Sequence, residues 1–152
     1  MPTKLLFAVM KRRGDGNGAE SIPAAYLTEW RERLAKYGVG LAGKHILEIG
    51  SGRYARLAPH MLAAGAHRVT LVDLYAVPVE QPEHYAMLAG DCAALGLELD
   101  DALARIKVIQ GDFVVLPAPD ADNKADLAIS AAVLEHVRDP GQVLAHCWEW
   151  LK

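Results

Sequence analysis

The segment HILEIGSGRYARL (His45–Leu57) carries the clearest structural pattern in this chain of 152 residues. Its first part, HILEI (45–49), is short and mostly apolar, which is typical of a buried strand. Gly50 and Gly52 follow, and glycine lets the backbone turn sharply and approach a ligand without a Cβ in the way. Arg53 then begins a stretch with helical composition. A strand, a glycine turn and a helix in this order predict a ligand-binding turn.

Three later segments are rich in apolar and β-branched residues and are predicted as strands: 68–73, 106–110 and 126–130. Helices are expected between them, over Arg53–Ala64 and within His84–Leu95. Continuously apolar strands suit a parallel sheet that is covered on both faces. Strands that alternate with helices predict an α/β fold of the doubly wound type, with about four strands in this chain.

The ends of the helices have recognisable signals. Ser21 is the expected N-cap of the first helix and Gly38 its stop, while Asp139 and Pro140 open the last helix. Pro59 should kink or shorten the helix that contains it. The first and the last helix each carry an apolar stripe at helical spacing that is expected to pack on the domain. In the first helix the stripe is Ile22, Tyr26, Trp30, Leu34 and Tyr37. In the last helix it is Val143, Leu144, Cys147, Trp148 and Leu151.

The composition is that of one globular domain, with 52% hydrophobic and 23% charged residues. Residues 1–20 contain GDGNG and are expected to be a flexible lead-in, with the folded domain over 21–152. The net charge of −3 gives no general attraction to nucleic acid or to an anionic membrane. The basic cluster Lys11–Arg13 is too short for a phosphate-binding face.

Cys92 and Cys147 lie far apart in the chain and have no second ligand at zinc spacing, so both are expected to be reduced and buried. The histidines likewise show no metal-site spacing. The apolar run near the N-terminus is too short for a signal peptide, and no stretch approaches the roughly 20 residues that span a bilayer. We therefore expect a soluble cytoplasmic protein without a metal.

Ligands of a doubly wound sheet bind just beyond the carboxyl ends of the strands. Glu48 lies there, and its carboxylate is a poor neighbour for a diphosphate because like charges repel at close range. It suits a zwitterionic, sulfonium-bearing cofactor with a cationic amino group. Asp73, at the end of the 68–73 strand, is placed to accept hydrogen bonds from ribose hydroxyls. Asp112 can accept from an adenine amine, and Phe113 offers an apolar face to the ring.

Taken together, these motifs have a known counterpart. The order E-x-G-x-G at 48–52, V-D at 72–73, G-D-F at 111–113 and DLAIS…LEHV within 126–137 resembles the class I S-adenosylmethionine-dependent methyltransferases. The resemblance covers about 45–152. It implies a Rossmann-like doubly wound sheet, S-adenosylmethionine as cofactor and methyltransferase activity.

The resemblance also implies roles for individual residues. Glu48 and the loop of Gly50, Ser51 and Gly52 would hold the methionine part of the cofactor. The remaining cofactor-binding positions would be Asp73 on the ribose, Leu74 beside the adenine, Asp112 and Phe113 at the adenine amine and edge, and Ser130 and Ala131 opposite them.

The sequence departs from the family pattern in two places. Tyr54 stands where the family often has a third glycine. The family continues with three further strands beyond the position of Lys152, so the sheet is expected to be incomplete and the 126–130 strand to be its edge. Proteins usually cover such an apolar edge, so we expect either further residues of the protein or another chain, in a homo-oligomer or from a partner, to complete the sheet.

Methyl transfer from a sulfonium is an in-line displacement, and it needs a general base only when the acceptor arrives protonated. His136 is the candidate base, although a histidine on a helix at this place is also typical of packing or capping. Methyltransferases that act on adenine or glutamine have a different motif at the positions that correspond to Ser130–Val133, which counts against such substrates here. The tail 134–152 resembles the branch that acts on small molecules.

Two other functions remain open. The pattern Gly50–Ala55 alone also fits a dinucleotide-binding turn, as in an NAD-binding domain. A non-catalytic module that keeps the fold for binding or assembly is the other alternative.

Overall fold

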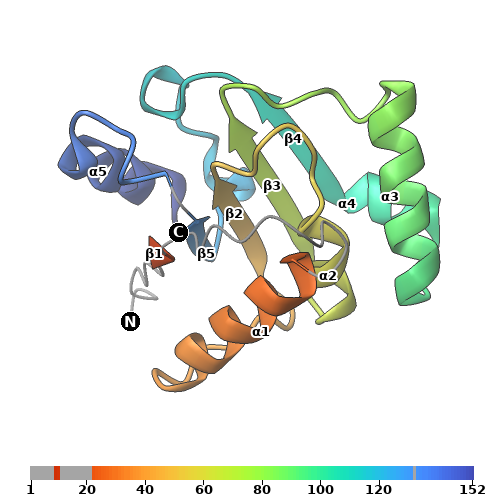
Figure 1. Ribbon diagram of the computed structural model, residues 1–152. Coiled ribbons are helices and arrows are strands. Elements are labelled where there is room, and N and C mark those ends of the chain that lie inside the picture. The colour runs from red at the N-terminus through yellow and green to blue at the C-terminus, as the bar shows by residue number, and fades with distance from the viewer. Residues whose placement is uncertain (1–8, 11–21, 132) are drawn as a thin grey trace.

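The computed structural model describes residues 9–10, 22–131 and 133–152. Its centre is a parallel sheet of five strands in the order β1-β5-β2-β3-β4. The strands are β1 (Val9–Met10), β2 (His45–Ile49), β3 (Arg68–Asp73), β4 (Ile106–Gln110) and β5 (Leu127–Ala131), as Figure 1 shows. The strand order reverses at β2, with β3 on one side and β5 on the other, which confirms the doubly wound α/β fold.

The predictions for β2, β3 and β4 match the structure residue for residue, and β5 begins and ends one residue later than predicted. All five residues of β2 are buried, because β2 lies between two strands and has a covered face on either side. This environment explains why β2 and β3 are mostly apolar, whereas β4, at the sheet edge, also carries Lys107 and Gln110.

The predicted edge position of β5 is wrong. β1 pairs with β5 through Val9 with Ser130 and Met10 with Ala131, so β5 is an inner strand of the described sheet. Val9 and Met10 belong to the segment 1–20 that was expected to be a flexible lead-in, and the rest of that segment lies outside the described residues. A sequence pattern cannot reveal so short a strand.

α2 (Ala58–Ala63) is shorter than the predicted helix over Arg53–Ala64, and residues 53–57 form a loop instead. Pro59 lies in the first turn of α2, where its missing N–H costs no hydrogen bond. The proline therefore shortens the helix, one of its two expected effects.

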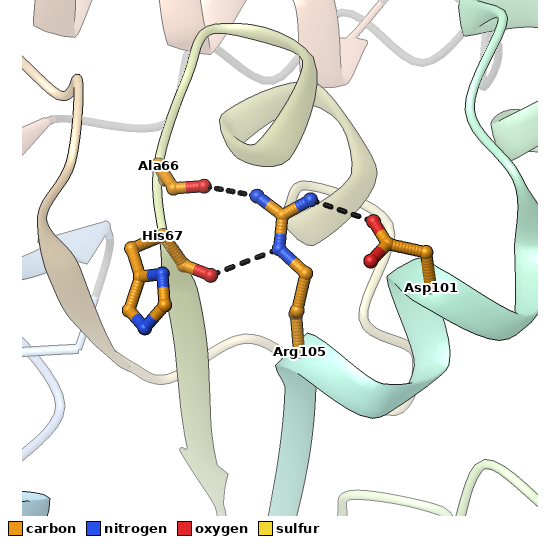
Figure 2. Close-up of polar contacts among 4 residues, drawn as sticks. All are labelled: Ala66, His67, Asp101 and Arg105. Atoms are coloured by element: carbon orange, nitrogen blue, oxygen red, sulfur yellow. Dashed lines mark hydrogen bonds and ion pairs between the residues drawn. The ribbon is translucent and has the colours of Figure 1, made fainter.

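The connection from β3 to β4 holds two helices, α3 (Pro82–Leu95) and α4 (Leu99–Arg105), of which only α3 was predicted. Gly96 ends α3 in the left-handed conformation, at φ 69°. Arg105 ends α4 and donates to the carbonyls of His67 (2.9 Å) and Ala66 (2.5 Å) and to Asp101 (2.8 Å), as Figure 2 shows. The two bonds to carbonyls connect the end of α4 to the residues just before β3, and the bond to Asp101 lies within α4.

The helices cover the two faces of the sheet unequally. α1 (Ile22–Ala35) to α4 pack on one face around Trp30, Leu34 and Met61. α5 (Pro140–Trp150) packs on the other face, apart from the other helices (Figure 1). In the described part of the chain, no helix is long and apolar enough to cross a membrane.

The helix-end and stripe predictions are partly right. The Asp139 carboxylate accepts from Gln142 N at 3.2 Å and caps α5 as expected, whereas Ser21 lies outside the described residues. Tyr37 is 69% and Trp148 58% exposed, so neither packs on the sheet as predicted. Trp150 takes that place in α5, since it lies on the same helix face as Val143 and Cys147.

Candidate cofactor site

A cavity of about 750 Å³ lies beyond the carboxyl ends of β2, β3 and β4. The loops that follow these strands line it, together with α1 and the turn before α5. The structure brings most of the predicted site residues into its lining: Glu48, Gly50, Ser51, Gly52, Asp73, Leu74, Asp112, Phe113 and His136.

Ser130 and Ala131 are placed differently. Ser130 is buried and is not among the described residues that line the cavity. Its Oγ has no hydrogen-bond partner in the described part of the chain. Ala131 is the last residue of β5 and pairs with Met10 of β1. Ser130 pairs with Val9 of β1 and with Ile49 of β2, so the end of β5 lies between these two strands.

Glu48 is the most unusual group in the cavity. Its side chain is 5% exposed, and its Oε2 has no partner among the described residues. Burial, and secondarily the nearby Asp73 carboxylate, raise the pKa of Glu48 to about 8. Without a cation beside it, this carboxyl group holds its proton at neutral pH.

The glycine loop carries the backbone conformation that the sequence suggested. Gly50 and Gly52 have φ of 81° and 78°, a region that residues with a Cβ rarely adopt. Gly50 N donates to Val72 O at 2.8 Å, which completes the last pair of β2 with β3, Ile49 with Val72. Ser51 lies between the glycines, half-buried at the cavity wall.

Asp73 ends β3, and its carboxylate connects the Gly50–Gly52 loop to the loop after β3, both of which line the cavity. Its Oδ2 accepts from Gly52 N at 2.8 Å, and its Oδ1 accepts from Tyr75 N at 2.7 Å. Leu74, beside it, is 53% exposed at the cavity mouth. An exposed leucine next to a carboxylate offers an apolar surface beside a hydrogen-bond acceptor.

Asp112 and Phe113 form the wall after β4. The Asp112 Oδ1 accepts from Val114 N at 3.2 Å and caps the short helix η1 (Phe113–Val115). The Phe113 ring is buried and packs against the rings of His146 (5.1 Å) and Trp150 (5.3 Å) of α5. These contacts hold one side of the cavity rigid.

His136 lies in a turn between β5 and α5, not on a helix as predicted. Its backbone N donates to Val133 O at 2.8 Å. The side chain is 75% exposed, and Nε2 lies 3.5 Å from a carboxylate oxygen of Glu135. The ring is thus free to approach a ligand from the cavity rim.

The structure adds lining residues that the sequence did not single out, notably Tyr75 after β3 and Arg138 before α5. Both stand in turns, where no periodic pattern exists. Tyr26 and Trp30 of α1 pack on the core, as their stripe predicts, and also line the cavity. The buried Trp30 Nε1 has no partner in the described part of the chain.

Within the described residues, no three His, Cys, Asp or Glu side chains are grouped so that they could hold a metal ion. The cavity lining itself includes carboxylates, glycine backbone and aromatic rings.

Comparison with known proteins agrees with this architecture. Residues 47–152 match the sequence family described as "Methyltransferase domain". Over 120 residues, 78% of the chain, the sequence is 29% identical to the ubiquinone biosynthesis O-methyltransferase of Pasteurella multocida and covers 46% of that protein.

Two solved structures share the fold. One is an S-adenosylmethionine-dependent methyltransferase from Mesorhizobium loti, with 22% identity over 82% of this chain and 49% of that chain and a TM-score of 0.53. The other, from Thiobacillus denitrificans, is in complex with S-adenosyl-L-homocysteine, with 21% identity over 80% of this chain and 44% of that chain and a TM-score of 0.51. The chain spans about half the length of these relatives.

Proposed function

This chain belongs to the methyltransferase-domain family, and on that basis we propose that it binds S-adenosylmethionine in its cavity and directs methyl transfer to a small-molecule acceptor. Residues 21–152 are the cofactor-binding domain in this proposal. We place the protein in the cytoplasm, a reducing compartment that suits the free, buried thiols of Cys92 and Cys147.

The observation that carries the proposal is the buried, unpartnered Oε2 of Glu48 at the cavity. A buried acceptor without a donor costs free energy, and the ammonium group of S-adenosylmethionine supplies both a donor and a compensating charge. The diphosphate of NAD offers Glu48 neither a donor nor a positive charge, and the nearby Asp73 carboxylate repels it.

The other lining residues support matching roles. The Gly50–Gly52 loop lies next to Glu48 and suits the methionine part, while Asp73 keeps free lone pairs for the ribose hydroxyls. Leu74, Asp112 and Phe113 provide the apolar and accepting groups that an adenine needs. Ser130, whose buried Oγ has no partner among the described residues, and Ala131 are proposed to lie beside the cofactor at the end of β5, opposite Asp112 and Phe113.

Calorimetric titration with S-adenosylhomocysteine and with NAD tests the proposal. We expect the first ligand to bind and the second not to, and Glu48→Gln to weaken S-adenosylhomocysteine binding by about 10- to 100-fold, since it removes a charge-assisted hydrogen bond. Glu98→Gln, an exposed change at the start of α4, is the control. Binding of NAD instead, or a cavity that takes neither ligand, would contradict the proposal.

A small-molecule acceptor agrees with the name of the Pasteurella relative, an O-methyltransferase. A hydroxyl acceptor must lose its proton as the methyl group arrives, and His136 at the cavity rim is the group we propose for that step. S-Adenosylmethionine supplies the methyl group when bound. The chain's own part is to align the acceptor with it and to exclude water.

A further inference from the structure

We propose that His84 is a positioning residue that holds the glycine loop and the loop after β3 in the arrangement that binds the cofactor. The inference rests on the proposed function and extends it to a residue that lies outside the cavity lining. His84 is fully buried in the first turn of α3.

Both ring nitrogens of His84 are used, one for each loop. Ala55 N donates to Nε2 at 2.9 Å, and Nδ1 lies 2.8 Å from Val77 O. A backbone N–H can only donate, so Nε2 must be the unprotonated nitrogen and Nδ1–H must donate to Val77. The ring is therefore neutral, and one tautomer joins residues 53–57 to residues 74–81.

Neighbouring contacts strengthen this connection. Val77 N donates to Arg53 O at 2.9 Å, so the two loops are also joined directly. Tyr54 packs its ring edge-to-face on His84, with centroids 5.4 Å apart. The position where the family often has a third glycine thus holds a side chain that covers the imidazole.

His84 and Asp73 both connect the segment 50–57 to the segment after β3, at different positions. At the cavity, the Asp73 Oδ2 accepts from Gly52 N. Outside the cavity lining, His84 accepts from Ala55 N, three residues after Gly52. Loss of the acceptor at Nε2 leaves the buried Ala55 N–H unsatisfied, and the loop must move to hydrate it. That movement shifts Gly52 relative to Asp73 and so deforms the cofactor site.

Two substitutions separate positioning from packing. His84→Gln keeps an acceptor near the place of Nε2, whereas His84→Asn is too short to reach Ala55. We expect S-adenosylhomocysteine affinity within about threefold of wild type for Gln and at least about tenfold weaker for Asn, the size of one lost buried hydrogen bond.

His45→Asn is the matched control. His45 is also buried and also uses both nitrogens, on Lys124 O (3.1 Å) and Thr70 Oγ1 (2.8 Å), but it lies at the other end of β2. We expect it to lower the melting temperature without weakening S-adenosylhomocysteine binding. Equal affinity losses for Gln and Asn at position 84, or wild-type affinity for Asn, would overturn the proposal.

Amide hydrogen exchange without ligand keeps the test independent of the proposed function. His84→Asn should speed exchange at Gly52 as well as at Ala55, whereas Gln should protect both amides. If the wild-type protein fails to bind S-adenosylhomocysteine, the proposed function fails and this measurement still tests the loop connection. Faster exchange at Ala55 alone, with exchange at Gly52 unchanged, would show that His84 stabilises only its immediate surroundings and would overturn its positioning role.

Discussion

The Asp73 carboxylate accepts one backbone hydrogen bond on each oxygen and still has lone pairs for a ligand. We expect Asp73→Ala to weaken S-adenosylhomocysteine binding by about 1–3 kcal/mol, because it removes charge-assisted hydrogen bonds to the ribose and the anchor of Gly52 N. Isothermal titration calorimetry measures the loss, and Asp120→Ala, at an exposed residue outside the cavity lining, is the control. Unchanged affinity would remove Asp73 from the site.

His136 is tested by activity rather than by binding. With radiolabelled S-adenosylmethionine and a panel of small hydroxyl-bearing acceptors, His136→Gln should lower kcat by about 100-fold or more if the ring removes the acceptor's proton. S-Adenosylhomocysteine affinity should stay the same. His67→Gln, an exposed change at the opposite end of the sheet, should leave both quantities unchanged. Full activity of the His136 variant would leave this histidine a rim residue with no part in the reaction.

At the scale of single elements, α5 depends on its N-cap. Asp139 accepts from Gln142 N, and this bond satisfies one of the free N–H groups of the first turn. Asp139→Ala should cost about 1 kcal/mol of unfolding free energy in urea denaturation. Asp120 precedes the short helix η2 (Ala121–Asn123) and makes no side-chain cap bond, so Asp120→Ala should cost much less. Equal losses would mean that the cap does not stabilise α5.

The elements that the sequence predicts well are those whose burial is continuous. β2 and β3 are apolar because strands and helices enclose them, so pattern and structure agree, and the edge strand β4 keeps enough β-branched residues to be predicted although only Ile106 is buried. α4 has only seven residues, too few to establish a helical period against a loop. α5 has apolar residues on two adjacent faces, and only the folded sheet selects Trp150 over Trp148 for burial.

The residues of the candidate site also divide into those that the sequence could predict and those that it could not. Glu48, Asp73 and Asp112 could be predicted because a parallel sheet brings the carboxyl ends of its strands to one edge. Tyr75 and Arg138 could not, since the conformation of a turn decides whether its side chains face the cavity. His84 carries no motif at all, and its role depends on two loops that meet only in three dimensions.

At the scale of the whole molecule, the sheet separates two cores that meet the cavity from opposite sides. Trp30 belongs to the core under α1, and Phe113 to the core under α5, yet both line the cavity. A ligand that contacts both would connect the two layers, so its binding should stabilise the entire fold. At a ligand concentration 100 times its Kd, the expected gain is about 2.7 kcal/mol.

The pH dependence of folding tests the electrostatics of the whole molecule through Glu48. Its pKa is about 8 in the folded protein against an ordinary value of 4.5, so between these values the folded state holds a proton that the unfolded chain has released. Ligand-free stability should therefore fall as pH rises through this window, by at most about 1.4 kcal/mol per unit. Glu48→Gln removes this contribution.

Urea unfolding of both proteins from pH 5 to 8, followed by tryptophan fluorescence, isolates the effect. Burial lowers the pKa of His45. Burial alone would raise the pKa of Asp126, but hydrogen bonds from the His45 N–H and from Lys152 outweigh it and lower that pKa. Both groups are common to the two proteins and cancel in the difference. The variant should gain stability over wild type as pH rises. Saturating S-adenosylhomocysteine should flatten the wild-type curve, since its ammonium group favours the ionised carboxylate. Parallel curves for the two ligand-free proteins would mean that Glu48 is already ionised in the fold, and the argument for a cation in this cavity would lose its basis.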